Sequence, residues 1–414
     1  MQTSRCVAGI DVHKKMLAVV VGRTREQSLQ LERGKFGTTT EHLELLSDWL
    51  QARGVEEVVM ESTGQYHKPV WLQLEGQFQL HLAQAHSNRG PKGRKSDFVD
   101  AQRMVRRFLS EDLILSYVPD LEQRLWRRLT RTKTSMSDQR KRVQSQVEGL
   151  LEEMMIKLSS VISDLFGLSG RRILAAIAAG EQDPVRLADL GDERLKVSQE
   201  ALRAALTGKV QPAHRLLLGL YLEQVKLIDE QIAVLEREIS VAMRSHAAAI
   251  ERLAEIPGLG IDSAQQIIAE TGPEAAAFPS AGQAASWVGV CPGREESAGE
   301  SHSNRSPKGN RPMRRLLNQV AWAAVRTNGS YFQDLFRRLL VKKGPKVSIW
   351  AVAHRLLRVI WKVLHQRVCY VEHGGRSAHP QAIQKRKRAL VRQLRELGYR
   401  VQIAEIPNSH PLRP

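Results

Sequence analysis

Residues 5–23 read RCVAGIDVHKKMLAVVVGR, and this stretch decides the fold of the N-terminal region. Two runs of small and β-branched apolar residues stand on either side of the polar turn VHKK. Such runs predict two short buried strands joined as a hairpin. Asp11 ends the first run, so the sequence places a carboxylate at the tip of a buried strand. A carboxylate is costly there unless it is paired or bound to a metal ion.

The residues that follow alternate between strand and helix patterns. Alternation in 27–38 predicts a third strand, and the helical spacing of 39–54, which starts at threonine and stops at glycine, predicts a helix. The apolar run 55–61 predicts another buried strand, which ends at Glu61. A helix, a strand and a second helix, with Ser96 as its N-cap, are expected at 65–76, 78–85 and 96–109. This order predicts an α/β layered domain over residues 1–115.

Beyond this domain, proline and glycine become sparse and heptad-like stretches carry charges on their outer positions. The pattern predicts long antiparallel coiled-coil helices over 116–250, with a role in spacing and oligomerisation. A mostly α C-terminal domain is expected over 251–340, interrupted by a basic loop between Pro292 and Pro312 that is rich in Gly, Ser and Pro. Residues 341–414 are expected to add a basic helix and a tail.

The charge balance favours nucleic acid as a partner. Lys and Arg total 62 against 44 Asp and Glu, a formal net charge of +18, while aromatics at 5% are too few for base stacking to be the main binding device. Cys6, Cys291 and Cys369 lie far apart, so neither a disulfide framework nor a zinc site is expected. Without an apolar signal core or a membrane-length run, a soluble, cytoplasmic and nucleoid-associated protein with no membrane partner is expected.

Four carboxylates are candidates for a metal site. Asp11 and Glu61 end apolar strands, and Asp97 and Asp100 are spaced to share one face of a helix. If they converge at one edge of the sheet, their oxygens suit Mg²⁺ or Mn²⁺, and two such ions about 4 Å apart can cut a phosphodiester. Taken alone, Asp11 or Glu61 is more often a turn-starting or solvent-facing carboxylate, and SDFVDAQR alone is more often a salt-bridged helix start. The combination of all four on these elements favours the metal site.

Three segments resemble the blocks of DEDD transposases of the insertion-sequence-110 family: GIDVHKK (9–15), VVMESTGQYHKPVW (58–71) and RKSDFVDAQRM (94–104). Residues 255–272 and 286–317 resemble the C-terminal transposase block of that family. The resemblance implies an RNase H-like N-terminal domain similar to Holliday-junction resolvases. It also implies that Asp11, Glu61, Asp97 and Asp100 are the catalytic, metal-binding tetrad.

The loop REESAGESHSNRSPKGNRPMRR (294–315) holds four serines among basic residues: Ser297, Ser301, Ser303 and Ser306. A serine hydroxyl can attack a scissile phosphate and form a phosphoserine that conserves the bond energy for rejoining. The residues alone favour a simpler hypothesis, a basic loop that contacts phosphates. The resemblance implies that Ser297 is the catalytic nucleophile, with Ser303 the second candidate. Ala298 stands after Ser297, where the family more often has glycine.

Nucleic-acid contacts are expected from basic residues near both candidate sites: Lys92, Arg94, Lys95, Arg305, Lys308, Arg311, Arg314 and Arg315. The stretch IPGLG (256–260) is similar to a helix-hairpin-helix element, in which Gly258 and Gly260 would let backbone N–H groups approach a phosphate. A simple tight turn between helices fits equally well. For His13, His67 and His86, a surface or packing role is favoured over proton transfer.

The sequence therefore predicts a metal-dependent DNA transposase that cleaves and rejoins strands. The resemblance implies donor and target DNA as substrates, guidance by a structured noncoding RNA (a bridge RNA), and dimers that join into a tetramer. Two alternatives stay open. A structure-specific endonuclease would need the four carboxylates but not Ser297, and a non-catalytic nucleic-acid-binding protein would need neither.

Overall fold

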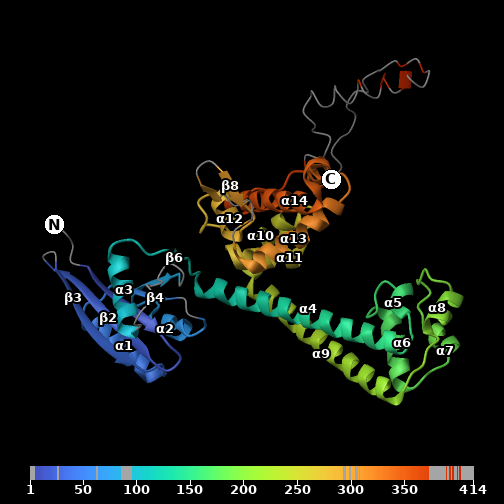
Figure 1. Cartoon of the computed structure of the whole chain (residues 1–414), viewed down its shortest axis with the longest axis horizontal. Coiled ribbons are helices and arrows are strands. Elements are labelled where there is room, and N and C mark those ends of the chain that lie inside the picture. Colours follow the sequence, from blue (N-terminus) through green and yellow to red (C-terminus); the bar gives the residue numbers. More distant parts are fainter. Residues whose placement is uncertain are drawn as a thin grey trace. The chain divides into compact units, whose positions relative to one another are not determined.

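The computed structural model describes residues 5–25, 28–61, 64–84, 96–291, 306 and 308–372, the backbone of 295–297 and 300–303, and a few isolated positions after 387 (Figure 1). The chain divides into two compact units: unit 1 covers residues 1–120 and unit 2 covers residues 121–414. Each unit has apolar cores of its own. The finer domain boundaries at 250 and 340 stay predictions.

Unit 1 is built on a six-stranded mixed sheet in the order β3-β2-β1-β4-β5-β6. Its strands are β1 Cys6–Val12, β2 Leu17–Arg25, β3 Ser28–Phe36, β4 Glu57–Glu61, β5 Gln79–Ala83 and β6 Leu115–Ser116. β1, β4 and β5 run parallel, while β2, β3 and β6 pair antiparallel with their neighbours. The expected α/β domain is confirmed. The sequence did not predict β6, because two residues are too few to show an alternation.

Helices cover both faces of this sheet: α1 Thr40–Gln51 and α2 His67–Leu74 on one face, α3 Asp97–Leu109 on the other. Successive β1 residues alternate between the two cores, Ile10 packing on the α1/α2 side and Val7 on the α3 side. Gly9 lies against α3, where a Cβ atom would stand 2.5 Å from the carbonyl oxygen of Ala101. Ser96 holds the N-cap position of α3, but its side chain makes no capping hydrogen bond.

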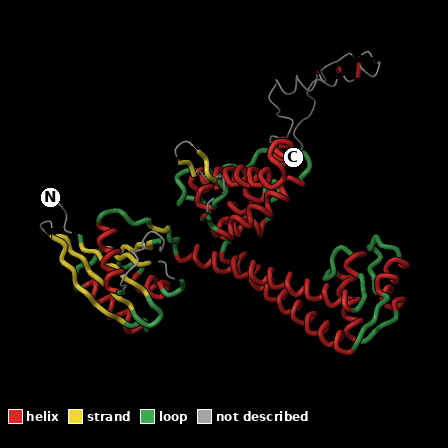
Figure 2. The backbone as a smooth tube through the Cα atoms, viewed as in Figure 1, coloured by secondary structure: helices red, strands yellow, loops and turns green. Residues whose placement is uncertain are grey.

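In unit 2, two long helices, α4 Leu121–Glu153 and α9 Pro212–Ala242, run side by side in opposite directions (Figure 2). Three contacts mark the pairing: Trp126 Nε1 donates to the carbonyl oxygen of Ala242 (3.1 Å), Lys133 pairs with Glu236 (2.7 Å), and Arg140 with Asp229 (2.6 Å). Positions one heptad apart on α4 thus meet positions about one heptad apart on α9. Long antiparallel helices are confirmed, and the coiled-coil supertwist stays a prediction.

Each end of this helix pair contributes to a separate apolar core. The first core joins the pair to α5 Leu158–Val161, α6 Leu168–Ala179, α7 Pro184–Asp189 and α8 Gln199–Leu206. The second joins the pair to α10 Ala247–Ala254, α11 Ile261–Thr271, α12 Ala281–Val288, α13 Arg311–Arg326 and α14 Tyr331–His365, and the short helix η1 Arg244–His246 precedes α10. Among the described helices, none combines the length and the hydropathy needed to cross a lipid bilayer.

The segment expected to be a loop between Pro292 and Pro312 contains a short hairpin, β7 Glu295–Ser297 and β8 Glu300–Ser303. Serine, glycine and glutamate are weak strand formers, which is why no strand is predicted here from the residues alone. α14 runs across the boundary expected at residue 340 and breaks at Gly344 (φ 71°), just before Pro345. Most of the basic helix expected near the C-terminus lies outside the described residues.

Candidate active site

Two of the predicted carboxylates lie at the same edge of the unit 1 sheet. Asp11 is near the carboxyl end of β1 and Glu61 is the last residue of β4. The two strands are parallel, with Ile10 opposite Met60, so the next residue on each strand is Asp11 or Glu61. The buried apolar residues before them hold the two strand ends in place, as the sequence predicted.

The third carboxylate, Asp97, lies near Asp11, and the side chain of His13 contacts both. Asp97 is the first residue of α3, and His13 lies in the turn between β1 and β2. His13 Nε2 stands 3.2 Å from Asp11 Oδ2 and 3.3 Å from Asp97 Oδ1. One ligand atom from each of these three residues lies within 4.8 Å of the others. We call this trio the acidic cluster.

Asp100 lies one turn further along α3, where its Oδ1 accepts a hydrogen bond from Arg103 Nη2 (2.6 Å). Its charge still reaches Asp11. Burial raises the pKa of Asp11 above its ordinary value, and while His13 lowers it, the carboxylates of Asp100 and Asp97 raise it further. Burial and the negative charges of Asp97 and Asp100 therefore both disfavour the ionised form of Asp11.

Such an arrangement suits a hard divalent cation. Carboxylate oxygens are the donors that Mg²⁺ and Mn²⁺ prefer, and a cation would relieve the repulsion among Asp11, Asp97 and Asp100. Glu61 borders Asp11 on the sheet edge but is not part of the acidic cluster. The sequence favoured a surface or packing role for His13, and the structure places its exposed side chain between two of the carboxylates. Its position two residues after Asp11 was the available signal.

The basic residues predicted to contact nucleic acid have varied surroundings. Lys92, Arg94, Lys95 and Arg305 lie outside the described residues, while Lys308 and Arg311 are exposed. Arg314 Nη1 donates to the carbonyl oxygen of Gly289 (2.6 Å), and its guanidinium stacks 4.6 Å from the Trp350 ring centre.

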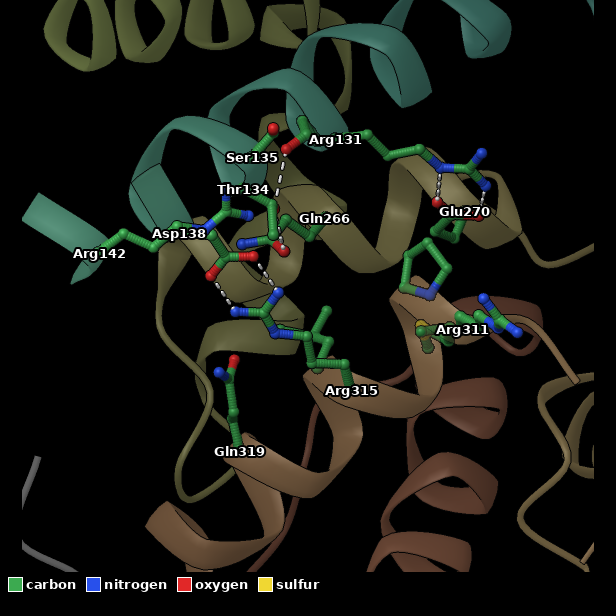
Figure 3. Close-up of a pocket in the computed structure, with 14 residues that line it drawn as sticks. Arg131, Thr134, Ser135, Asp138, Arg142, Gln266, Glu270, Arg311, Arg315 and Gln319 are labelled. Carbon is green, nitrogen blue, oxygen red and sulfur yellow. Dashed lines mark hydrogen bonds and ion pairs between the residues drawn. The ribbon is translucent and has the colours of Figure 1, made fainter. Parts of the chain in front are cut away.

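Arg315 forms a two-bond ion pair with Asp138 of α4 (Figure 3). This pair lines a pocket of about 340 Å³ between α4, α11 and α13, which Arg142 and Arg311 also line. Arg314 and Arg315 thus hold the fold of unit 2, and a role for them in binding nucleic acid stays a prediction.

The two glycines of the expected helix-hairpin-helix element differ. Gly258 has a φ of +83° and packs against α13, where a Cβ atom would stand 2.4 Å from the backbone nitrogen of Ala324. Close helix packing therefore explains this glycine. Gly260 is the exposed N-cap residue of α11, where a Cβ atom would meet none of the described residues within 4 Å. A phosphate contact at either glycine stays a prediction.

Ser297 is the last residue of β7 and pairs with Glu300 across the hairpin turn. Ser303 ends β8 and pairs with Glu295. Ser301 also belongs to β8, and Ser306 follows the hairpin. The hairpin belongs to unit 2 and the acidic cluster to unit 1, so the catalytic role of Ser297 stays a prediction.

Both parts of the chain that carry candidate residues match sequence models of transposases. Residues 8–156 match the model of DEDD transposases of IS110 elements, described as "Transposase". Residues 250–337 match the model described as "Transposase IS116/IS110/IS902 family". Together the two matches cover more than half of the chain. The chain belongs to the IS110 family of transposases, with a DEDD N-terminal domain followed by the family's C-terminal domain, and the resemblance noted from the sequence is confirmed.

Individual relatives agree with this assignment. A "Probable family 20 transposase" of Pseudomonas aeruginosa is 30% identical over 152 residues, 36% of this chain and 44% of the relative. The "Insertion element IS900 uncharacterized 42 kDa protein" of Mycobacterium paratuberculosis is 26% identical over 231 residues, 51% of this chain and 57% of the relative. The chain thus spans about half the length of these relatives.

Proposed function

We propose that this protein is a DNA transposase that cleaves and rejoins strands, with unit 1 as an RNase H-like catalytic domain. The observation that carries the proposal is the acidic cluster, which lies at the sheet edge within the segment that matches DEDD transposases. Asp11, Glu61, Asp97 and Asp100 would hold Mg²⁺ or Mn²⁺. When bound, the metal would supply Lewis-acid stabilisation of charge on the phosphate oxygens.

The protein's own residues would supply the rest of the reaction. The Ser297 hydroxyl would attack a scissile phosphate, forming an O–P bond as the bond to the leaving DNA oxygen breaks. Serine gives up one proton and the leaving oxygen takes one up, so the step is balanced. The phosphoserine would keep the energy of the broken bond for rejoining. Lys308 and Arg311, both exposed near the hairpin, would contact the DNA backbone.

The proposed partners are donor and target DNA, a structured noncoding guide RNA and further copies of the chain. The net charge of +18 supports binding to nucleic acid. An exposed apolar stripe on α9, formed at heptad spacing by Leu220, Leu227, Val234 and Val241, supports self-association. Sedimentation of the Leu227→Glu variant tests this, because a charge in that stripe should shift the protein toward monomer. An unchanged sedimentation profile would count against the stripe as the interface.

The first experiment is to purify the protein from its native host and sequence the nucleic acid that accompanies it. A single discrete RNA supports guidance and identifies the DNA sites, whereas mixed RNA or none removes the guide from the proposal. Cleavage at those sites is then compared for Ser297→Ala and for Ser303→Ala as the matched control. Loss of the protein–DNA adduct in Ser297→Ala alone supports the serine recombinase. Undiminished cutting by Ser297→Ala would instead favour the structure-specific endonuclease.

A further inference from the structure

The residues that flank the hairpin β7–β8, 287–289 before it and 309–310 after it, are hydrogen-bonded to each other. We call these flanking residues the base of the hairpin. The backbone N–H of Asn310, just after the hairpin segment, donates to the carbonyl oxygen of Trp287, just before it (3.1 Å). Gly309 packs so closely that a Cβ atom would stand 2.2 Å from the carbonyl oxygen of Val288. Arg314 donates to the carbonyl oxygen of Gly289 (2.6 Å). The two ends of the segment are therefore fixed at one place.

The side chain of Asn310 makes two different hydrogen bonds. Its Oδ1 accepts from the backbone N–H of Met313 (3.0 Å) and so caps α13. Its Nδ2 donates to Glu270 Oε2 on α11 (2.8 Å). The capping bond needs only an oxygen, which serine or aspartate also offers. The second bond needs a donor, and asparagine offers one on a separate atom, the amide nitrogen, while its oxygen caps the helix.

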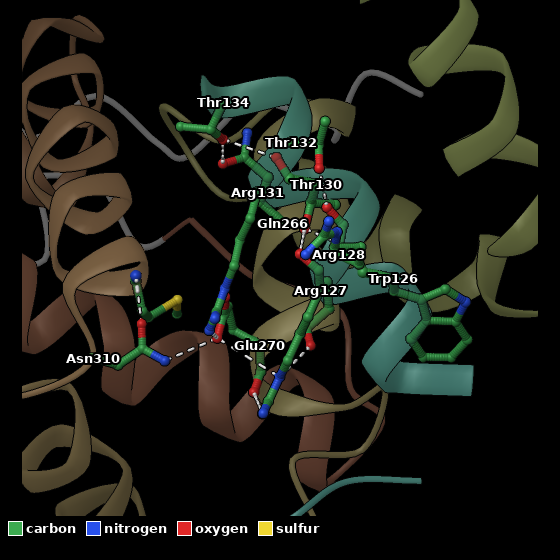
Figure 4. Close-up of polar contacts among 12 residues, drawn as sticks. Trp126, Arg127, Arg128, Thr130, Arg131, Thr132, Thr134, Gln266, Glu270 and Asn310 are labelled. Atoms are coloured by element: carbon green, nitrogen blue, oxygen red, sulfur yellow. Dashed lines mark hydrogen bonds and ion pairs between the residues drawn. The ribbon is translucent and has the colours of Figure 1, made fainter. Parts of the chain in front are cut away.

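Glu270 connects this base to α4 (Figure 4). The residue is 3% exposed, and its two carboxylate oxygens accept hydrogen bonds from Arg131 Nε (2.7 Å) and Nη2 (2.9 Å). Arg127, one turn earlier on α4, donates to the backbone carbonyls of Ala269 (3.0 Å) and Glu270 (2.5 Å). A buried carboxylate held in this way has one orientation, because any other would leave charges unpaired.

We infer that Glu270 and Asn310 are a positioning pair that holds the base of the Ser297 hairpin to helix α4. The contacts run from Arg131 through Glu270 and Asn310 to the hairpin, and α4 begins at Leu121, directly after unit 1. Neither residue needs to touch DNA. The pair acts by fixing where the hairpin leaves the helical core, so the inference rests on the proposed role of Ser297.

The test separates the pair from the capping role of Asn310. Asn310→Asp keeps a capping oxygen but turns a second carboxylate toward Glu270. Adding Glu270→Gln restores a donor and an acceptor with their positions exchanged. Ser280→Asp is the matched control, since it places the same charge on the exposed N-cap of α12, a helix of the same apolar core as α13. If Asn310→Asp does not fold, Asn310→Ser keeps a capping oxygen and removes the side-chain amide that donates to Glu270.

Two readouts are taken, one without substrate and one with it. Amide hydrogen exchange of the full chain is followed at residues 287–291 and 308–313, and the rate of the Ser297–DNA adduct is measured on the identified site. Asn310→Asp should speed exchange at both ends of the hairpin and slow the adduct by about 10- to 100-fold with DNA affinity unchanged, because small misplacements of a reacting group have large effects on rate. The double variant should recover part of both losses, because the 270–310 bond returns while one Arg131 nitrogen loses its acceptor. Ser280→Asp should match the wild type.

Three outcomes would overturn the inference. In the first, exchange at the hairpin base is unchanged in Asn310→Asp. In the second, exchange is faster but the adduct forms at the wild-type rate. In the third, the double variant recovers neither readout, which would mean general damage to α13. Failure of the serine proposal looks different, because Ser297→Ala would then cut DNA normally while the exchange data still decide whether the pair holds the base.

Discussion

Two groups of carboxylates, the acidic cluster of unit 1 and Glu270 of unit 2, have opposite surroundings. At the sheet edge of unit 1, Asp11 and Asp97 share a single histidine, and burial together with neighbouring carboxylates raises the pKa of Asp11. In unit 2, the buried Glu270 is matched by two arginines and an asparagine. An acidic group without enough positive charge is suited to bind a cation, whereas a fully compensated one fixes packing. The same side-chain chemistry is therefore suited to binding at the acidic cluster and to packing at Glu270.

The largest expected effect comes from removing the charge that unit 1 leaves uncompensated. Asp11→Asn should reduce metal-dependent cleavage by roughly a thousandfold or more, because a proposed metal ligand is lost. Without metal, the same change should leave the melting temperature unchanged or higher, because it relieves the burial and repulsion that raise the pKa of Asp11. Cleavage assays and thermal melting with and without Mg²⁺ check both parts.

Glu44→Gln, which removes an exposed carboxylate from α1, is the control and should change neither measurement. A clear loss of stability in metal-free Asp11→Asn would contradict the view that this carboxylate is held unfavourably. Retained cleavage would remove Asp11 from the catalytic site.

Removing the carboxylate of Glu270, which is paired in unit 2, should lower the stability of the fold. Glu270→Ala leaves Asn310 and the half-exposed Arg131 without their acceptor and should cost about 1–3 kcal/mol of unfolding free energy. Glu274→Ala is the matched control, because its partner Arg367 and Glu274 itself are more than half exposed, and it should change stability by less than about 1 kcal/mol. Thermal or urea unfolding measures both variants. Equal losses would mean that burial does not distinguish the two carboxylates.

Strong periodic patterns in the sequence predicted most of the fold. The apolar runs before Asp11 and Glu61 indicated two buried strands, which the structure shows to be parallel neighbours, and the heptad-like stretches indicated α4 and α9. The site was predicted in part for the same reason, since the parallel strands end at one edge of the sheet and Asp97 begins the helix beside it. Local periodicity carries this information because each residue's face follows from its own position in the element.

Several contacts that the sequence did not predict depend on residues far apart in the chain. Glu270 looked like an ordinary helical glutamate until folding brought Arg131 and Asn310 to it. Likewise, Arg315 resembled a phosphate-binding residue, but Asp138 of α4 takes up its guanidinium. Spacing along the chain cannot reveal such partners, because they are set by how the helices pack.

Two glycines extend the comparison from charge to packing. Gly9→Ala in unit 1 would push α3 off the sheet, because its Cβ atom would meet Ala101 at 2.5 Å and Val105 at 2.8 Å. We expect a loss of about 1–3 kcal/mol and slower cleavage, since α3 carries Asp97 and Asp100. Gly149→Ala on α4 of unit 2 meets none of the described residues within 4 Å and should gain about 0.5–1 kcal/mol. Unfolding curves and cleavage rates measure both, and a stabilised Gly9→Ala would contradict the close packing of α3.

The smallest expected effect tests a compensated carboxylate nearer the surface. Asp229 on α9 accepts hydrogen bonds from Arg140 (2.6 Å) and Arg171 (2.5 Å), and these outweigh the effect of partial burial to hold the pKa of Asp229 below its ordinary value of 3.8. A lowered folded-state pKa means that the stabilisation is complete above the unfolded value and is lost as pH falls through the folded one.

Asp229→Asn should therefore lower the unfolding free energy by about 1 kcal/mol at pH 7. The expected loss is small because the side chain of Asp229 is 28% exposed and solvent screens its charge. The difference from the wild type should shrink below about pH 4 and vanish at still lower pH. Asp189→Asn, whose carboxylate is 63% exposed and 3.9 Å from Arg203, should show no difference at either pH. Unfolding curves across this range measure the effect. A deficit that persisted in acid would show that Asp229 stabilises α9 through its shape rather than its charge, and would separate this pair from the compensated carboxylates that distinguish unit 2.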